Sequence, residues 1–268
     1  MNSNTKPALP GRAGTRLADK VALVTGIGAG IGKGVALLFA QQGARVIGCD
    51  IDAAAAAATV EEARALGLTI DSLHPCDLTD PTQVKRFIDL GVERQGGIDI
   101  LVNAAAFGVF EPLATMDYQN GWRKTMTGEL DIVFLACQAA WPHLIARGGG
   151  VILNFASANA YVALETSPAL AHCAGKGGVL AMTRQIAAEG STHGIRANTI
   201  SPALVETAAT RYPLDNIPGF REQVMTKLMV KRLGQPVDIA WAAVYLCSDE
   251  SSWVTASDFQ IDGGATSW

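Results

Sequence analysis

Residues 20–32 read KVALVTGIGAGIG, a short apolar run that ends in a glycine-rich turn. The residues that follow, VALLFAQQG, have the periodicity of an amphipathic helix and end at Gly43. We therefore expect a strand, a tight turn containing Gly26, Gly30 and Gly32, and a helix, in that order. Such a turn leaves backbone N–H groups and the positive end of the helix free to bind a pyrophosphate. The glycine spacing does not fit the GxGxxG template, so the prediction depends on the strand before the turn and the helix after it.

The same alternation of strand and helix continues along the chain. Each predicted strand is almost continuously apolar, as expected for strands that are covered on both faces. The pattern predicts an α/β fold with one Rossmann-like doubly wound parallel sheet of about seven strands and helices on both faces. The further strands are expected at residues 44–50, 68–78, 98–106, 149–157, 193–203 and 258–264, and the further helices at 51–67, 80–97, 117–147, 168–192 and 236–248.

The domain organisation is simple. We expect residues 1–18 to form a flexible N-terminal tail and residues 19–268 to form a single cofactor-binding catalytic domain. Residues 206–234 lack a clear period and are long for a connection, so they are predicted to cover the substrate. The alternative is that they form two ordinary surface helices.

Composition and charge exclude several classes of function. The formal net charge of -4 and the pI of about 5.6 give no electrostatic reason to bind nucleic acid or an anionic membrane. No run of apolar residues is long enough to span a bilayer, and the five cysteines show no CxxC pairing, so a cytoplasmic protein with no metal site is expected. The expected partners are a small-molecule substrate and further copies of the chain.

Asp50 stands at the end of the second predicted strand, eighteen residues after Gly32. A carboxylate at this position can accept hydrogen bonds from a ribose 2′-hydroxyl and would repel a 2′-phosphate, which favours NAD over NADP. Lys33 complicates this prediction, because it stands at the start of the helix and its orientation is open.

Residues 157–176, SANAYVALETSPALAHCAGK, bring a hydroxyl, an imidazole and an ammonium into one short segment. His172 and Lys176 are four residues apart in a predicted helix, so they lie on the same face and can act on one bound molecule. This arrangement predicts proton transfer.

Several motifs occur together: TGxxxGIG followed by an aspartate, an LVN strand end, a serine followed by an xxxK segment, and SPxxVxT before a closing DGG. Together they resemble the short-chain dehydrogenase/reductase family, from about Arg16 to Gly264. The resemblance implies an oxidoreductase with a nicotinamide dinucleotide cofactor, and a homotetramer or homodimer.

The resemblance also implies roles for individual residues. It identifies the glycine-rich turn as the phosphate-binding turn and Asp50 as the acid that binds the adenosine ribose. It also places residues against the adenine and the nicotinamide, and Lys176 holds the nicotinamide ribose. Ser157 matches the serine that binds the substrate oxygen. The cofactor-binding residues implied in this way are Gly26, Ala29, Gly30, Ile31, Gly32, Asp50, Ile51, Asp77, Leu78, Asn103, Ala104, Ala105, Lys176, Pro202, Val205 and Thr207.

Two departures from the family pattern concern the proton chemistry. His172 occupies the position of the family's catalytic tyrosine, and Glu129 aligns with a helix asparagine that anchors a water in the proton relay. The interval from Ser157 to His172 is also two residues longer than is common. Histidine can serve as general acid and base, because its unperturbed pKa of about 6.5 lies near working pH. Lys176 would favour a neutral imidazole, whereas Glu129 would favour the protonated ring or hold its tautomer.

Three hypotheses follow. The first is an NAD-dependent oxidoreductase of a secondary alcohol or ketone, with His172, Ser157, Lys176 and Glu129 as its catalytic residues. Within this hypothesis, the alternative is that His172 only packs and the acid/base function is absent or lies elsewhere, with Tyr161 as the rival proton donor. The second hypothesis is a non-redox or internally redox enzyme, such as a lyase, dehydratase or epimerase, that keeps NAD bound. The third hypothesis is a scaffold or sensor that binds NAD without turnover.

Overall fold

The structure, a computed structural model, describes residues 13–163 and 167–267. Within these residues one sheet of seven strands has the order β3-β2-β1-β4-β5-β6-β7, and all paired neighbours are parallel. The doubly wound parallel sheet predicted from the sequence is therefore confirmed. The strands are β1 (Val21–Thr25), β2 (Arg45–Cys49), β3 (Ile70–Leu73), β4 (Ile100–Asn103), β5 (Gly150–Phe155), β6 (Ile195–Pro202) and β7 (Asp258–Ile261).

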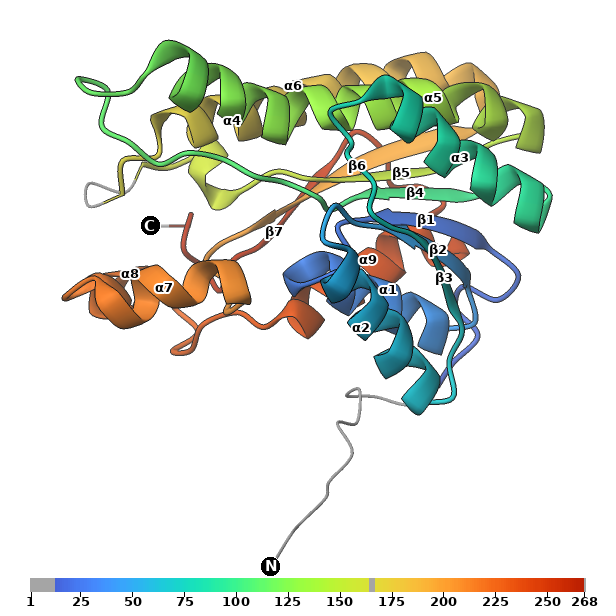
Figure 1. Ribbon diagram of the computed structural model, residues 1–268, viewed down its shortest axis with the longest axis horizontal. Coiled ribbons are helices and arrows are strands. Elements are labelled where there is room, and N and C mark those ends of the chain that lie inside the picture. The colour runs from blue at the N-terminus through green and yellow to red at the C-terminus, as the bar shows by residue number, and fades with distance from the viewer. Residues whose placement is uncertain (1–12, 164–166, 268) are drawn as a thin grey trace, which may run out of the picture.

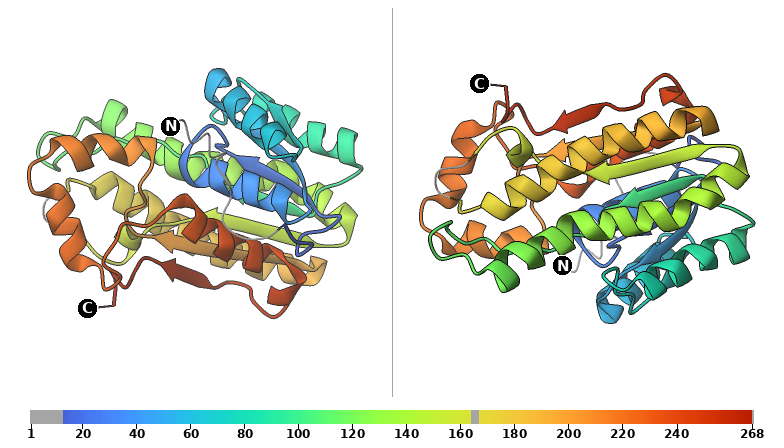
Figure 2. Two further views of the ribbon diagram at one scale, coloured as in Figure 1. Left: turned by 90° about the horizontal axis from the view of Figure 1, so that it is seen from below. Right: turned by 90° about the horizontal axis from the view of Figure 1, so that it is seen from above.

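Helices cover both faces of the sheet (Figures 1 and 2). One face carries α1 (Gly30–Gln41), α2 (Ala53–Ala65) and α9 (Pro236–Cys247), and the other carries α3 (Pro81–Gln95), α5 (Ile132–Arg147) and α6 (Leu170–Gly190). Short 3-10 turns occur at Ala158–Ala160 (η3), Ser191–His193 (η4) and Asp249–Ser251 (η5).

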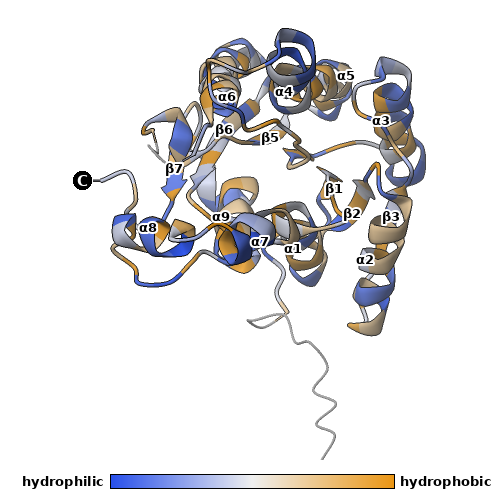
Figure 3. Cartoon of the chain, turned by 60° about the vertical axis from the view of Figure 1, so that its left-hand side comes forward, coloured by the Kyte–Doolittle hydropathy of each residue, from blue (hydrophilic) through white to orange (hydrophobic). Residues whose placement is uncertain are grey.

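The central strand β1 shows why its sequence is apolar throughout. Ala22 and Val24 pack in the cluster under α1 and α9, whereas Val21 and Leu23 pack in the cluster under α3 and α5. Successive side chains of a strand point to opposite faces, so both sets are buried. The helices carry hydrophobic and hydrophilic colours together in Figure 3, as amphipathic helices do when one side lies on a sheet.

The long helix predicted at 117–147 is present, but its first half is not regular α-helix. Two π-helical turns, η1 (Tyr118–Arg123) and η2 (Thr127–Asp131), flank the short α4 (Lys124–Met126) before α5 begins. The carbonyl of Gly128 in η2 accepts the N–H of Phe107 at 3.2 Å, and a Cβ at Gly128 would lie 2.2 Å from the Phe107 carbonyl oxygen. The loop after β4 therefore packs directly on the helix backbone at the π turn, a local distortion that periodicity does not predict.

Residues 206–234 form two short helices, α7 (Ala208–Asn216) and α8 (Phe220–Lys227), at one end of the sheet (Figure 1). Leu214, Phe220 and Val224 form a small apolar cluster of their own, and a parallel bridge between Val205 and Gly234 closes the base of the excursion. The two-helix alternative thus describes the local structure, and the role of substrate cover stays a prediction.

The predicted tail lies partly outside the described residues, which begin at residue 13. The last residues of the predicted tail are packed against the domain. Leu17 is fully buried, the N–H of Gly14 donates to the carbonyl of Gln41, and Arg16 Nε donates to Glu250 at 2.7 Å. The ordered domain therefore begins before residue 19. Among the described residues, no helix is both long and apolar enough to cross a bilayer.

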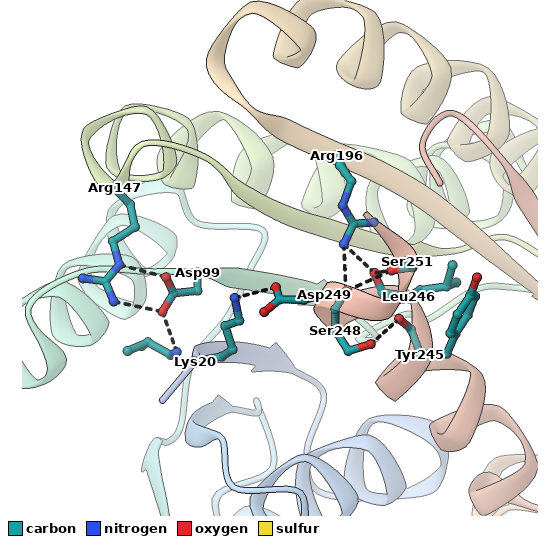
Figure 4. A network of polar contacts seen from close by, with 10 residues as sticks. Lys20, Asp99, Arg147, Arg196, Tyr245, Leu246, Ser248, Asp249 and Ser251 are labelled. Atoms are coloured by element: carbon teal, nitrogen blue, oxygen red, sulfur yellow. Dashed lines mark hydrogen bonds and ion pairs between the residues drawn. The ribbon is translucent and has the colours of Figure 1, made fainter. Parts of the chain in front are cut away.

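Asp99, directly before β4, joins the start of β1 to Arg147 at the end of α5 (Figure 4). Its carboxylate accepts the Val21 N–H at 2.8 Å and the Arg147 side chain at 2.8 and 3.2 Å. Burial alone would raise the pKa of Asp99, but the hydrogen bonds from Arg147 and Val21 outweigh it and hold the pKa below its usual value.

Candidate active site

A cavity of about 380 Å³ lies at the carboxyl ends of the strands. Its walls come from the loops that follow β1, β2, β3 and β4, so it lies beside the point where the sheet order reverses between β1 and β4. Open α/β sheets bind their ligands in this crevice.

The turn after β1 is shaped by its glycines. Gly26 has a φ of 73° and Gly30 a φ of 57°, values in the left-handed region that favours glycine. A Cβ at Gly32 would lie 2.2 Å from the carbonyl oxygen of Gly26, so only glycine permits this close approach. Helix α1 begins at Gly30, and Ala29 at its N-cap supplies no capping side chain. The N–H groups of the first helical turn are therefore free to bind phosphate oxygens.

Asp50 lines the same cavity, next to the glycine-rich turn. Its carboxylate accepts the N–H of Gly28 at 2.7 Å and the N–H of Asp52 at 2.9 Å, which fixes its position against the phosphate turn. Lys33 forms an ion pair with Glu62 at 2.5 Å. The lysine whose orientation the sequence left open is thus engaged by α2.

Most of the residues predicted to bind the cofactor line the cavity. These are Gly26, Ala29, Gly30, Ile31, Gly32, Asp50, Ile51, Asp77, Leu78, Ala104, Ala105 and Thr207. Sequence reasoning missed further lining residues, namely Cys76, Thr79, Ala106, Phe107, Ile132 and Ala209. The residues after the third and fourth strands could have been found, because the carboxyl ends of neighbouring parallel strands share one edge.

Other predicted cofactor residues have different surroundings. The Asn103 side chain donates to Asn154 Oδ1 at 2.8 Å inside the protein. Pro202 ends β6, and Val205 is buried and lines a second, smaller cavity. These residues would therefore have to contribute to cofactor binding through their backbone or through a neighbouring residue. The cavity nevertheless fits a dinucleotide, because it combines a glycine cradle, the N–H groups at the start of α1 and the Asp50 carboxylate.

Three predicted catalytic side chains meet in one hydrogen-bonded chain. Ser157 follows β5, His172 lies in the first turns of α6, and Glu129 lies in the π turn η2. His172 Nε2 is 3.2 Å from Ser157 Oγ, and His172 Nδ1 is 2.6 Å from Glu129 Oε1. The two extra residues between Ser157 and His172 therefore do not separate them.

The chemistry of the groups determines the direction of each bond. With Glu129 ionised, its carboxylate can only accept, and Nδ1 of His172 is then the donor in this bond. In the neutral ring Nε2 is then the acceptor, and the Ser157 hydroxyl donates to it. The N–H of Asn159 donates to Ser157 Oγ at 3.1 Å and completes the chain.

Glu129 is enclosed by two close backbone approaches. Its residue is 3% exposed, and no described group lies within hydrogen-bonding distance of its Oε2. A Cβ at Gly175 would lie 2.9 Å from Oε2, and one at Gly108 would lie 3.1 Å from Oε1. The two glycines make the space that the carboxylate occupies. Gly175 stands inside a helix, where glycine is unfavourable. Its position in the sequence therefore indicates a packing role.

Lys176 lies one turn after His172 and is buried, with its Nζ donating to the carbonyl of Phe155 at 3.0 Å. Burial lowers the pKa of the Lys176 ammonium, and the negative charge of Glu129 offsets part of that effect. Glu129 therefore interacts electrostatically with the lysine and by hydrogen bond with the histidine.

Two aromatic side chains lie near this chain. The Phe110 ring lies 5.3 Å from the His172 ring, centroid to centroid, and Phe110 is 52% exposed. The Tyr161 hydroxyl donates to Asp258 Oδ2 at 2.9 Å, so the alternative proton donor is hydrogen-bonded to β7. Phe110 was not found from the sequence, because no motif marks it.

The fold and the cavity define a Rossmann-type, dinucleotide-binding protein. Residues 26–266 match the model of a family described as enoyl-(acyl carrier protein) reductase. The chain is 39% identical over 256 residues to a D-threitol dehydrogenase of Mycolicibacterium smegmatis, covering 94% of each chain. It is 33% identical over 252 residues to an NAD-dependent glycerol dehydrogenase of Listeria innocua, covering 93% of this chain and 95% of the relative.

Among solved structures, a 7α-hydroxysteroid dehydrogenase complexed with NADH and 7-oxo glycochenodeoxycholic acid matches with a TM-score of 0.88. It shares 32% sequence identity, and the match covers 94% of this chain and 96% of that chain. The chain belongs to the short-chain dehydrogenase/reductase family of oxidoreductases, which use a nicotinamide cofactor.

Proposed function

We propose that the protein is an NAD-dependent oxidoreductase that interconverts a secondary alcohol and its ketone, with His172 as general acid and base. One observation carries the proposal: the His172 imidazole is hydrogen-bonded on both nitrogens, to Ser157 and Glu129, beside the cofactor cavity. The two sites adjoin through the loop after β4, because Phe107 lines the cavity and Gly108 borders the Glu129 carboxylate.

The geometry suggests how this chain moves a proton. Ser157 Oγ would hold the substrate oxygen, and Nε2 of His172 would take the hydroxyl proton during oxidation and return it during reduction. Because Glu129 accepts from Nδ1, it would hold the tautomer in which Nε2 carries no proton. It would also stabilise the imidazolium that forms when Nε2 takes one. Glu129 thus acts through His172 as a positioning residue.

The cofactor half of the proposal uses the residues around the cavity. The N–H groups at the start of α1 would hold the pyrophosphate, and Lys176 would hold the nicotinamide ribose. NAD, when bound, accepts the hydride from the substrate carbon. Asp50 favours NAD over NADP, because its carboxylate can accept from a ribose 2′-hydroxyl and would repel a phosphate there. Lys33, paired with Glu62, does not offset that charge.

The relatives support an alcohol or ketone as the substrate class. The names of the threitol, glycerol and hydroxysteroid dehydrogenases all state dehydrogenation of a hydroxyl-bearing molecule, although their carbon skeletons differ widely. We therefore propose that the substrate is a secondary alcohol, and a panel of different carbon skeletons will identify it.

Absorbance at 340 nm in the presence of NAD or NADP, recorded over a panel of polyols, cyclic alcohols, hydroxysteroids and their ketones, tests this function. We expect NADH to form in equal amount with the ketone product, and NADP to be a poor substitute. Product formation without any net change in NADH would refute the redox proposal and favour the lyase, dehydratase or epimerase alternative. Binding of NADH without turnover of any member of the panel would favour the scaffold or sensor.

We also propose that copies of the chain associate as a homodimer or homotetramer. Phe134 and Ile145 on α5 are 49% and 37% exposed, and an apolar helix face of this kind is typical of a subunit interface. Sedimentation velocity tests this, since a monomer at micromolar concentration would contradict it.

A further inference from the structure

The hydrogen-bonded chain of Ser157, His172 and Glu129 also has the order hydroxyl, imidazole, carboxylate. The imidazole contacts a hydroxyl through Nε2 at 3.2 Å and a carboxylate through Nδ1 at 2.6 Å. A hydroxyl hydrogen-bonded to a base that is itself oriented by a third group is the arrangement that activates a nucleophile, and it is recognised by geometry and roles rather than by fold.

The three groups differ in their exposure to solvent, as a nucleophile, a base and an orienting acid require. The Glu129 side chain is 4% exposed, whereas the His172 side chain is 16% exposed and Ser157 is 9% exposed. The acid is therefore the most shielded of the three groups and the base is the most exposed, with the buried serine beside it. Burial strengthens the attraction between the carboxylate and an imidazolium, because fewer water dipoles screen it.

We propose that Ser157, His172 and Glu129 also form a nucleophilic triad that hydrolyses esters of short apolar acids through an acyl group on Ser157. Ser157 Oγ forms a bond to the ester carbonyl carbon as its proton passes to His172 Nε2. The tetrahedral adduct then breaks the bond to the alcohol oxygen, which leaves with the proton from Nε2. A water molecule then attacks the acyl carbon and gives one proton to Nε2. The bond between the acyl carbon and Ser157 Oγ breaks, Nε2 returns the proton to Oγ, and the acid leaves.

Two neighbours suit this reaction. The N–H of Asn159 donates to Ser157 Oγ at 3.1 Å, so it can stabilise the negative charge that this oxygen gains as its proton leaves. The exposed Phe110 ring beside His172 offers an apolar surface to a short acyl chain. This reaction requires no dinucleotide and no hydride transfer, so it is independent of the redox function proposed above.

The test uses the full chain without added dinucleotide. Hydrolysis of p-nitrophenyl butyrate is followed by release of nitrophenolate, and a fluorophosphonate probe followed by peptide mass spectrometry identifies the modified residue. We expect Ser157 to be labelled, and Ser157→Ala to abolish both signals. In His172→Ala the labelling rate should fall at least about 100-fold, the usual contribution of a general base. Glu129→Gln should lower it about 10-fold or more, because the ring loses its charged partner.

Ser252→Ala, which removes an exposed hydroxyl after η5, is the matched control and should behave as the wild type. Fluorescence titration with NADH on every variant shows that the fold and the cofactor site are intact. The proposal is overturned if Ser157 is not labelled, if labelling is equally fast in His172→Ala, or if Ser157→Ala still hydrolyses the ester at the wild-type rate. None of these results bears on NADH production from alcohols, so the two proposals can fail separately.

Discussion

Glu129→Gln separates the charge of the carboxylate from its shape. Glutamine has the same length, and its side-chain oxygen can still accept from His172 Nδ1 across the present 2.6 Å contact. A hydrogen bond to a charged group contributes about 1.5–3 kcal/mol. Since about 1.4 kcal/mol corresponds to a tenfold change in rate, loss of the charge should lower kcat about 10- to 100-fold.

Steady-state oxidation of an alcohol with NAD, followed at 340 nm, measures this effect, and NADH fluorescence gives the cofactor affinity. Glu129 does not line the cavity, and its effect on Lys176 is electrostatic and weaker than that of burial. We therefore expect kcat to fall while the Kd of NADH changes less than about threefold. Glu93→Gln, an exposed glutamate on α3, is the control for the loss of one negative charge and should leave kcat unchanged. A kcat within twofold of the wild type in Glu129→Gln would refute the assigned role.

Gly175→Ala should lower kcat about 10-fold and destabilise the fold by about 1–3 kcal/mol, because its Cβ would lie 2.9 Å from the Glu129 carboxylate. Gly177→Ala on the same helix meets nothing within 4 Å, so kinetics and denaturant titrations should show unchanged kcat and unchanged or higher stability. Asp50→Asn should raise the ratio of kcat/KM for NADP to that for NAD about 10-fold, and an unchanged ratio would exclude ribose selection by this carboxylate. Asp99→Asn should cost about 1–2 kcal/mol at pH 7. The pKa of Asp99 is lowered in the folded state, so this difference should persist above about pH 4 and disappear as the pH falls below it, which urea titrations at several pH values would show.

The fold was predictable because its determinants are local. A buried parallel strand needs an apolar run, and the phosphate turn needs glycine at positions that the chain marks plainly, such as Gly26 and Gly32. The carboxyl ends of such strands meet at one edge, so the place of the cofactor cavity followed from the strand order. The same reasoning predicted that Asp50, directly after β2, lines this cavity.

The proton-transfer half was predictable only in part. His172 was found through its spacing to Lys176 and through the family pattern, and Glu129 through alignment with a helix position. The alignment does not show that the Glu129 carboxylate would contact the His172 imidazole, because that contact depends on the π turn η2. That turn arises where the loop after β4 packs on the backbone of Gly128, a tertiary contact without a local signal. Asn103 shows the opposite case, because a residue at a motif position uses its side chain to hold Asn154.

The central claim is that His172 carries the proton during hydride transfer. The most direct measurement is kcat of His172→Ala in NAD-dependent alcohol oxidation, determined together with the Kd of NADH. We predict that kcat falls at least about 100-fold, since a positioned general base contributes about 10²- to 10⁴-fold, while NADH binds as in the wild type. An undiminished kcat in the alanine variant would contradict it.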